Sequence, residues 1–326
     1  MIHVQTPCRL HLGIFNLAAG GYGGIGVAID RPNVRLTVAR AGGLSAGGLS
    51  AGGLSAGGLS AGGLSATGPQ SKRALQAAEL FRQAYRVQAG AEIVVASAIT
   101  PHVGLGSGTQ IALAAAAALA RLWRVDAPIA AIATVVGRGA RSRIGLQAFL
   151  YGGFVAHATW RSGETATRVA PFPASWHWVV AAPLESEGLS GQAEATAFAE
   201  LPPMGADASR EARDLVELEI LPGVQQADLP RFGRGLMSLQ AIVGDYFAPV
   251  QGGRYAHPLG EQLAAALLDA GCAGVGQSSW GPSICGVIAG ESEAQRALAA
   301  VMDRFGAAGG LRAWVAAPDN HGTRWG

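Results

Sequence analysis

The chain has 326 residues, of which 49% are hydrophobic and 14% charged, and its formal net charge is only +2. These values are typical of a globular protein with one large core or two modest ones, and they exclude a basic surface of the kind that binds nucleic acid. Three cysteines without metal-ligand spacing and the lack of a basic leader followed by an apolar run predict a soluble cytoplasmic protein without a membrane segment.

The N-terminal segments predict an antiparallel or mixed sheet. Strand patterns cover residues 3–5, 9–15, 27–29 and 34–38. Residues 19–26 are rich in glycine and predict a flexible turn between the second and third of these strands. Arg9 and His11 share one strand face, opposite Leu10 and Leu12, so both ionisable groups could point into a cleft. On this pattern alone, a solvated strand face is the favoured alternative.

A low-complexity insert follows at residues 41–66. Residues 41–65 are five tandem copies of Ala-Gly-Gly-Leu-Ser, in which each unit offers a single large apolar side chain. So little burial does not offset the entropy of ordering the chain. We therefore expect an exposed, flexible loop without chemistry of its own, and not a solenoid.

The most informative stretch is residues 101–122, which read PHVGLGSGTQ and then an alanine-rich run. A strand predicted at 93–99 precedes it and a helix predicted at 111–122 follows, so a glycine-rich turn leads into a helix N-terminus. Gly104, Gly106 and Gly108 can take positive φ and admit a ligand close to the backbone, while free N–H groups and the helix dipole favour an anion. A tight turn before a capped, buried helix is the alternative.

The side chains of this loop extend the prediction. Ser107 and Thr109 can each cap the helix, and the Ser107 hydroxyl is a candidate Mg²⁺ ligand. The pattern is neither GxxxxGK[ST] nor GxGxxG with a downstream acid, so P-loop and Rossmann sites are disfavoured. The predicted anion-binding residues here are Gly104, Leu105, Gly106, Ser107, Gly108, Thr109 and Gln110.

Arginine must supply the positive charge for bound anions, because Lys72 is the single lysine. Arg138, Arg141 and Arg143 lie close together beside glycines, and each could bind a phosphate or carboxylate in bidentate fashion. A solvated turn is the alternative for this cluster.

The remaining chain predicts helices and strands around two further polar segments. The predicted helices are 71–87, 128–136, 192–199, 208–220, 229–247, 257–269 and 291–305, and the predicted strands are 154–159, 165–169, 176–182 and 311–316. Gln251 stands beside two glycines, and a small-residue loop between short strands carries Gln277, Ser278, Ser279 and Trp280. These residues offer hydrogen-bonding groups and a flat apolar face.

Three glycine-rich segments, CRLHLG, PHVGLGSGTQ and GVGQSSWGP, stand in an order that resembles the GHMP kinase superfamily. That superfamily normally has Ser-Ser-Ala after Gly-Leu-Gly, where this chain has Ser107-Gly108-Thr109-Gln110, and its third motif is a Gly-Gly-Gly-like loop. These variants, together with RLHLG, GRGARSRIG and PVQGG, resemble a non-kinase family within it, the β-ribofuranosylaminobenzene 5′-phosphate synthases.

The resemblance implies an α+β, two-part fold. Residues 1–170 would form an N-terminal domain like domain 2 of ribosomal protein S5, a mixed sheet with helices that carries the 41–66 insert. Residues 171–326 would form a ferredoxin-like α/β sandwich. A homodimer is also implied.

The implied activity is a pentosyl transfer in methanopterin biosynthesis. A ring carbon of 4-aminobenzoate, or of 4-hydroxybenzoate, would attack C1 of phosphoribosyl pyrophosphate, and CO₂ and pyrophosphate would leave. Mg²⁺ on the pyrophosphate would assist and no organic cofactor is needed. The implied catalytic residues are Arg9, His11, Ser107, Gln277 and Ser278, and substrate would also contact the 104–110 loop, Arg138, Arg141, Arg143, Gln251, Ser279 and Trp280. An ATP-dependent small-molecule kinase and a non-catalytic binding protein are the alternatives.

Overall fold

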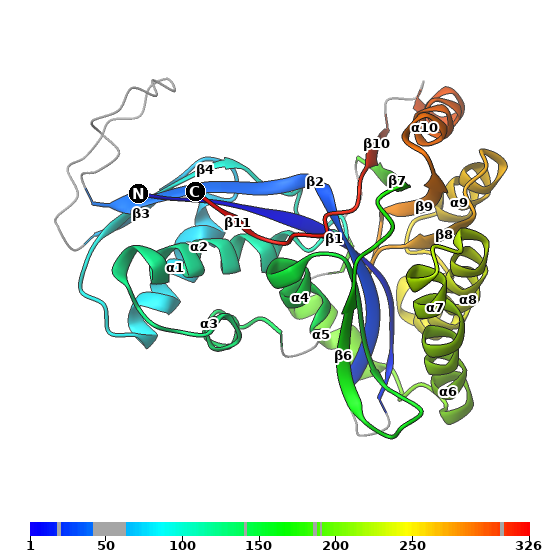
Figure 1. Ribbon diagram of the computed structural model, residues 1–326, viewed down its shortest axis with the longest axis horizontal. Coiled ribbons are helices and arrows are strands. Elements are labelled where there is room, and N and C mark those ends of the chain that lie inside the picture. Colours follow the sequence, from blue (N-terminus) through cyan, green and yellow to red (C-terminus); the bar gives the residue numbers. More distant parts are fainter. Residues whose placement is uncertain (18–20, 42–62, 140–141, 185–187, 190, 307–309) are drawn as a thin grey trace.

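The structure is a computed structural model that describes residues 1–17, 21–41, 63–139, 142–184, 188–189, 191–306 and 310–326. Its framework is a seven-stranded mixed sheet and a four-stranded antiparallel sheet (Figure 1). The first sheet contains β1 (Ile2–Asn16), β2 (Tyr22–Arg40), β3 (Leu64–Thr67), β4 (Ala91–Ser97), β5 (Phe154–Thr159), β6 (Thr165–Ala170) and β11 (Arg324–Trp325). The second contains β7 (Trp176–Pro183), β8 (Gly274–Gln277), β9 (Ile284–Ala289) and β10 (Leu311–Ala316).

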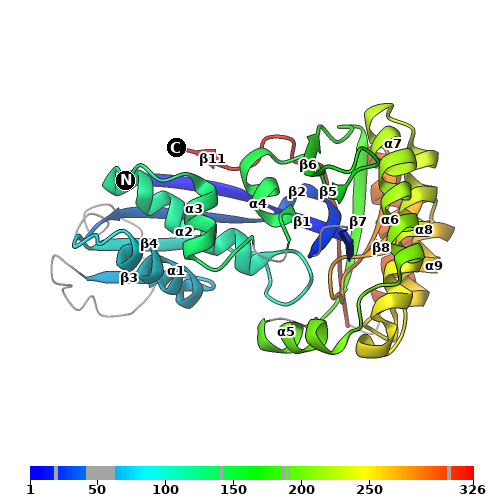
Figure 2. The ribbon, with the colours of Figure 1, turned by 90° about the horizontal axis from the view of Figure 1, so that it is seen from below.

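The helices fall into two groups at opposite ends of the molecule, with α1–α4 along the first sheet and α6–α9 beside the second (Figures 1 and 2). They are α1 (Ser71–Ala84), α2 (Ser107–Trp123), α3 (Ile129–Val135), α4 (Ile144–Tyr151), α5 (Gly191–Glu200), α6 (Ala206–Leu215), α7 (Leu221–Gln225), α8 (Leu229–Gln251), α9 (Gly260–Asp269) and α10 (Glu291–Phe305). A π-helical turn, Val216–Ile220, joins α6 to α7.

The alanine-rich helix α2 is the centre of the N-terminal half. It packs against β1, β2 and three other helices, and nearly every side chain from Ile111 to Ala120 is buried. Alanine suits this position because its short side chain lets neighbouring elements approach closely while keeping the highest helix propensity. The helix therefore presents a fixed N-terminus to whatever lies beyond Gly106.

The second sheet is buried on both faces, and its strands alternate accordingly. Val179 and Ala181 of β7 pack with residues of α9 and α10, whereas Trp178 and Val180 belong to the core that includes Phe232 of α8. This alternation is the period of two expected of a strand between two layers.

Two predictions at the N-terminus need correction. The predicted turn at 19–26 is wrong from Tyr22 onward, because that segment is part of the long strand β2. Glycine is needed there for space, since a Cβ on Gly23 would lie 2.5 Å from the carbonyl oxygen of His157. The two strands predicted at 3–5 and 9–15 form one strand with irregular register near Thr6.

The insert also departs from prediction at its end. Leu64–Thr67 forms β3, which pairs in parallel with β4, so the last repeat is not wholly an irregular loop. Residues 42–62, to which most of the loop prediction applies, lie outside the described residues.

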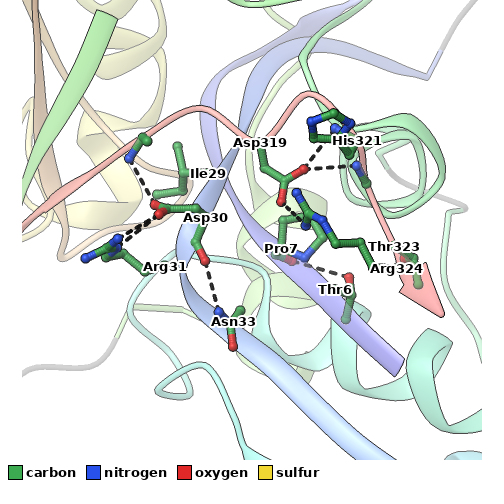
Figure 3. Close-up of polar contacts among 12 residues, drawn as sticks. Thr6, Pro7, Ile29, Asp30, Arg31, Asn33, Asp319, His321, Thr323 and Arg324 are labelled. Carbon is green, nitrogen blue, oxygen red and sulfur yellow. Dashed lines mark hydrogen bonds and ion pairs between the residues drawn. The ribbon is translucent and has the colours of Figure 1, made fainter. Parts of the chain in front are cut away.

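The C-terminal residues return to the first sheet, a pairing the sequence did not predict. Arg324–Trp325 forms β11 beside β1, and Ile29 forms an isolated bridge with Pro318. Asp319 is buried and accepts hydrogen bonds from the backbone N–H groups of residues 321 and 322. It also forms an ion pair with Arg324 at 2.6 Å (Figure 3). The Asp30 carboxylate accepts a hydrogen bond from the backbone N–H of residue 317 at 2.9 Å, which fixes the start of this C-terminal segment.

Candidate active site

A cavity of about 490 Å³ opens at the N-terminus of α2. The loop before the helix and the first helical turn form one side, and residues of α1, of the segment after α3 and of α5 form the others. Its polar and glycine lining comprises Arg9, Arg73, Gln76, His102, Gly104, Gly106, Ser107, Gly108, Thr109, Arg138, Gly191, Glu194 and Ser279. Leu105 also lines it, so six of the seven residues predicted at 104–110 face this space.

The glycine loop has the backbone that an anion site requires. Gly104 and Gly106 have φ of 82° and 81°, which confirms the expected positive φ at these two positions. α2 begins at Ser107, earlier than the predicted Ile111, and Gly106 is its N-cap without any side-chain cap. The expected capping by Ser107 or Thr109 is therefore wrong. The backbone N–H groups of Thr109 and Gln110 donate to Gly106 O at 3.1 Å, which leaves those of Ser107 and Gly108, two residues of the cavity lining, without an acceptor in the helix.

Three arginines from three elements crowd this helix end. A Cβ on Gly106 would lie 3.2 Å from Cζ of Arg9, and one on Gly108 would lie 3.4 Å from a terminal nitrogen of both Arg73 and Arg138. Gly108 has helical backbone, so no special φ requires its glycine, and a Cβ there would make ordinary van der Waals contact with the two guanidinium groups.

The charge of Arg73 lowers the pKa of Arg138, so these two like charges repel each other, and a bound anion would relieve the repulsion. The positive end of the α2 dipole adds to the same potential. Among the described residues that line the cavity, Glu194 is the one acid, and it also accepts a hydrogen bond from Trp280 Nε1 at 3.2 Å. The cavity is thus a site with a net positive charge.

Arg9 has the clearest unmet hydrogen bond. Its backbone N–H donates to Leu105 O at 3.2 Å and its guanidinium donates to Gly104 O, yet its Nε is buried and has no partner in the described part of the chain. Burial lowers the pKa of Arg9 to about 10, so the group keeps its charge at neutral pH. A buried donor left without an acceptor costs about 1–3 kcal/mol, which an anion at this point would recover.

Of the two described arginines in the predicted cluster, one lines the cavity and the other does not. Arg138 lines the cavity, and burial followed by the charge of Arg73 lowers its pKa. Arg143 precedes α4 and is absent from the cavity lining; its charge contributes, after burial, to the lowered pKa of His157. Arg141 lies outside the described residues.

Several residues that line the cavity were not predicted from the sequence, among them Arg73, His102 and Glu194. Arg73 Nη2 lies 3.0 Å from His102 Nε2, and His102 has a positive φ of 60° in the loop before Gly104. One signal could have found Arg73: it lies in the first turn of α1, where a cation opposes the helix dipole and no acid balances it. A cation placed against the dipole suggests a ligand of opposite charge.

His11 lies in a smaller pocket of about 20 Å³ on the other side of Ser279. The favoured alternative for the strand face is wrong, because Arg9 is half-buried and His11 is buried. Burial, and then the charge of Arg9, holds the pKa of His11 well below its usual range, so its ring is neutral at neutral pH. His11 Nε2 lies 3.0 Å from Ser142 Oγ.

The glutamine and tryptophan residues around this smaller pocket are largely committed to internal contacts. The Gln277 side chain accepts from Ala256 N at 2.8 Å and donates to Gln251 Oε1 at 3.2 Å and to Ser279 O at 3.0 Å. Trp280 is buried and makes T-shaped ring contacts with Phe198 and Phe247.

Ser278 and Gln110 hold neighbouring elements together. Ser278 Oγ accepts from the His11 backbone N–H at 3.0 Å and donates to Gly104 O at 2.8 Å. Gln110 Nε2 donates to Gly145 O at 2.9 Å, and its oxygen accepts from the Thr6 hydroxyl. Both residues are fully buried, and they fix the glycine loop and α2 relative to β1 and α4.

No described group of three His, Cys, Asp or Glu side chains could hold a metal ion. Nor is any described helix long and apolar enough to cross a membrane.

Comparison with known proteins places this arrangement in a class. Residues 72–153 match the family of GHMP kinase N-terminal domains and residues 220–308 match the GHMP kinase C-terminal family, together more than half of the chain. Homoserine kinase from Cytophaga hutchinsonii superposes with a TM-score of 0.68 at 17% identity, covering 99% of this chain and 96% of that one. Mevalonate kinase from Methanococcus jannaschii gives 0.67 at 13% identity, covering 98% of each. The chain belongs to the GHMP kinase superfamily, and the implied two-part α+β fold is confirmed.

Its curated relatives are named for a synthase and not for a kinase. The β-ribofuranosylphenol 5′-phosphate synthase of Archaeoglobus fulgidus is 29% identical over 301 residues, 87% of each chain. The protein of the same name from Methanothermobacter thermautotrophicus is 26% identical over 302 residues, 87% of this chain and 88% of that one. The likeness identifies this chain as an enzyme and does not favour the kinase alternative.

Proposed function

We propose that the chain is a decarboxylating C-ribosyltransferase of tetrahydromethanopterin biosynthesis. It would join the ribosyl phosphate unit of phosphoribosyl pyrophosphate to the ring of 4-hydroxybenzoate or 4-aminobenzoate. The observation that carries this proposal is the cavity in which Arg9, Arg73 and Arg138 surround the N-terminus of α2. The word phenol in the names of the relatives favours the hydroxy acid as the acceptor.

The two phosphate groups of the donor would lie on either side of the first turn of α2. Arg9 approaches from the side of Gly106 and has a free Nε, whereas Arg73 and Arg138 approach from the side of Gly108. One side suits the pyrophosphate and the other the 5′-phosphate, since arginine forks match phosphate oxygens in bidentate fashion.

The residues present fit a Mg²⁺ ion that arrives with the donor. The Ser107 hydroxyl and the Glu194 carboxylate are the candidate protein ligands in the cavity, and Mg²⁺ commonly takes one or two such oxygens with the rest from phosphate and water. When bound, the ion would neutralise charge on the departing pyrophosphate.

The chemistry needs positioning and charge stabilisation more than covalent help. As the C1–oxygen bond breaks, its electron pair leaves with pyrophosphate towards Arg9 and the α2 N–H groups. The ring carbon that carries the carboxylate bonds to C1, and the bond to CO₂ then returns its pair to the ring, so no ring proton is removed. His11 is buried outside the lining of this cavity and its lowered pKa makes it a weak base, so we assign it no proton transfer with the acid.

The proposal is tested with carboxyl-labelled 4-hydroxybenzoate and 4-aminobenzoate. With phosphoribosyl pyrophosphate and Mg²⁺, one of them should release labelled CO₂ and an equal amount of pyrophosphate. Arg138→Gln should lose most of this release, whereas Arg121→Gln, at the other end of α2, should retain it. Transfer of the γ-phosphate of ATP to a small alcohol, with no release of CO₂ from either acid, would overturn the proposal.

We also propose, from the family resemblance, that the enzyme is cytoplasmic and homodimeric. Light scattering of the purified protein should give twice the chain mass of 33.0 kDa. A monomer at micromolar concentration would contradict the dimer.

A further inference from the structure

A second pocket, of about 310 Å³, lies where the edge strand β10 meets the first sheet. Its volume is at the low end of small-molecule sites. The lining is mostly apolar and comprises Pro32, Val103, Leu105, Ala182, Pro183, Leu184 and Trp314, with Arg31, Thr100 and Arg312 as its polar members. None of these residues was predicted to be functional except Leu105.

The polar side of this pocket carries one uncompensated charge. Arg31 forms an ion pair with Asp30 at 3.0 Å, which neutralises it (Figure 3). Arg312 donates to the neutral hydroxyl of Thr100 at 3.0 Å, and within the described residues it has no ion pair. A ligand here would therefore be expected to carry a single negative charge.

The apolar side has a fixed aromatic ring. Trp314 follows Arg312 by two residues on β10, so both side chains lie on the same face of the strand. The indole Nε1 donates to the backbone carbonyl of Arg31 at 3.2 Å, which fixes the orientation of the half-buried ring. A flat apolar group suits such a ring, since aromatic pairs gain energy beyond their buried area.

The pocket is separate from the cavity at α2. Leu105 is the residue common to both linings, and its buried side chain forms a wall between them. Ser283 holds the same loop by donating to Val103 O at 2.6 Å. A ligand in this pocket would therefore lie behind the glycine loop, away from a donor in the cavity.

We propose that this pocket is a second binding site, which takes an aromatic monocarboxylate with its ring against Trp314 and its carboxylate on Arg312. The site does not depend on the proposed function, because it rests on the charge and shape of a different surface. A ligand there would act on the glycine loop from behind, as an effector and not as the reacting acid.

Calorimetry with benzoate tests the proposal, in the presence of saturating inorganic pyrophosphate to occupy the cavity at α2. We expect benzoate binding that depends on Arg312 and Trp314. Arg312→Gln should weaken binding at least tenfold, and Trp314→Leu should do so as well, whereas Arg304→Gln, an exposed arginine on α10, should bind like the parent. Benzamide, which has the same ring without the charge, should bind at least tenfold more weakly than benzoate.

Two results would overturn the proposal. Unchanged benzoate affinity in Arg312→Gln, with native thermal unfolding, would show that the pocket is not the site. Loss of benzoate binding in Arg138→Gln but not in Arg312→Gln would place the acid in the cavity at α2. A crystal structure of the benzoate complex would identify the position directly.

Discussion

The cavity at α2 and the smaller pocket beyond Ser279 differ in how their polar groups are satisfied. In the cavity, Arg9 Nε has no hydrogen-bond partner among the described residues, and Arg73 and Arg138 lie beside Gly108. In the smaller pocket, the amides of Gln251 and Gln277 bond to each other and to the backbone. A site built to receive an anion leaves donors unpaired, whereas a structural polar cluster pairs them internally. This difference separates two groups of residues that look equally polar in the sequence.

The strongest test of the comparison is Arg9→Gln. Because this substitution removes the unpaired donor at the helix end, we expect CO₂ release to fall by about a hundredfold or more. Arg9→Lys keeps the charge without the planar fork, and pyrophosphate binding should weaken by roughly 1–3 kcal/mol. Arg143→Gln, outside the cavity, is the control and should match the parent. Equal losses at Arg9 and Arg143 would show that net charge, and not this geometry, holds the anion.

Two serines allow the comparison to be made with one kind of mutation. Ser107→Ala removes a hydroxyl that faces the cavity, so the rate should fall by roughly tenfold to a hundredfold with little change in thermal unfolding. Ser278→Ala removes a buried hydroxyl with two internal partners, so the protein should lose about 1–3 kcal/mol of stability. Steady-state kinetics and urea unfolding measure both effects. The comparison fails if the two variants behave alike.

Gly108→Ala should separate activity from stability. The new methyl group would lie 3.4 Å from both Arg73 and Arg138, an ordinary van der Waals contact, and would occupy space between these side chains that the donor needs, so the Michaelis constant of the donor should rise about tenfold. Alanine in a helix is favoured over glycine by about 0.5–1 kcal/mol, so the melting temperature should rise or stay constant. A fall in stability without a change in the Michaelis constant would show that the donor does not use the space beside Gly108.

The smallest expected effect concerns His11. Its pKa in the folded state lies below the unfolded value near 6.5, because burial and Arg9 disfavour the charged ring. The unfolded chain therefore binds more protons below that pH, and stability should be complete above about pH 6.5 and fall as the pH drops below it. The slope from this group is at most about 1.4 kcal/mol per pH unit. Urea unfolding of His11→Gln between pH 7 and pH 5 should show a flatter dependence than the parent.

Much of the fold followed from sequence periodicity. The helix Glu291–Phe305 and the strand Leu311–Ala316 have the predicted ends, because alternating burial and good helix formers act locally. β11 was missed because two residues carry no periodic signal and pair with a strand at the other end of the chain. The glycines of β2 were read as a turn because close packing against neighbouring backbone requires glycine as much as a turn does.

The candidate site was predictable only where local backbone defines it. Gly104 and Gly106 were found because positive φ and a following helix leave a sequence signature. Arg73 was not found because an arginine on an amphipathic helix looks solvent-exposed until the fold brings α1 against α2. Likewise, spacing could not tell which arginine of 138–143 turns towards the cavity, since that depends on where the loop between α3 and α4 runs.

The pairing of β11 with β1 has a consequence for how the protein is made. β1 is synthesised long before β11, so that edge of the first sheet stays open until β11 has been made. Asp319 and Arg324, which hold the returning segment by an ion pair, are synthesised after both sheets' other strands. A nascent chain stalled before Asp319 should therefore expose the edge of β1 to other strands, and a tag fused after Gly326 would sit next to His3.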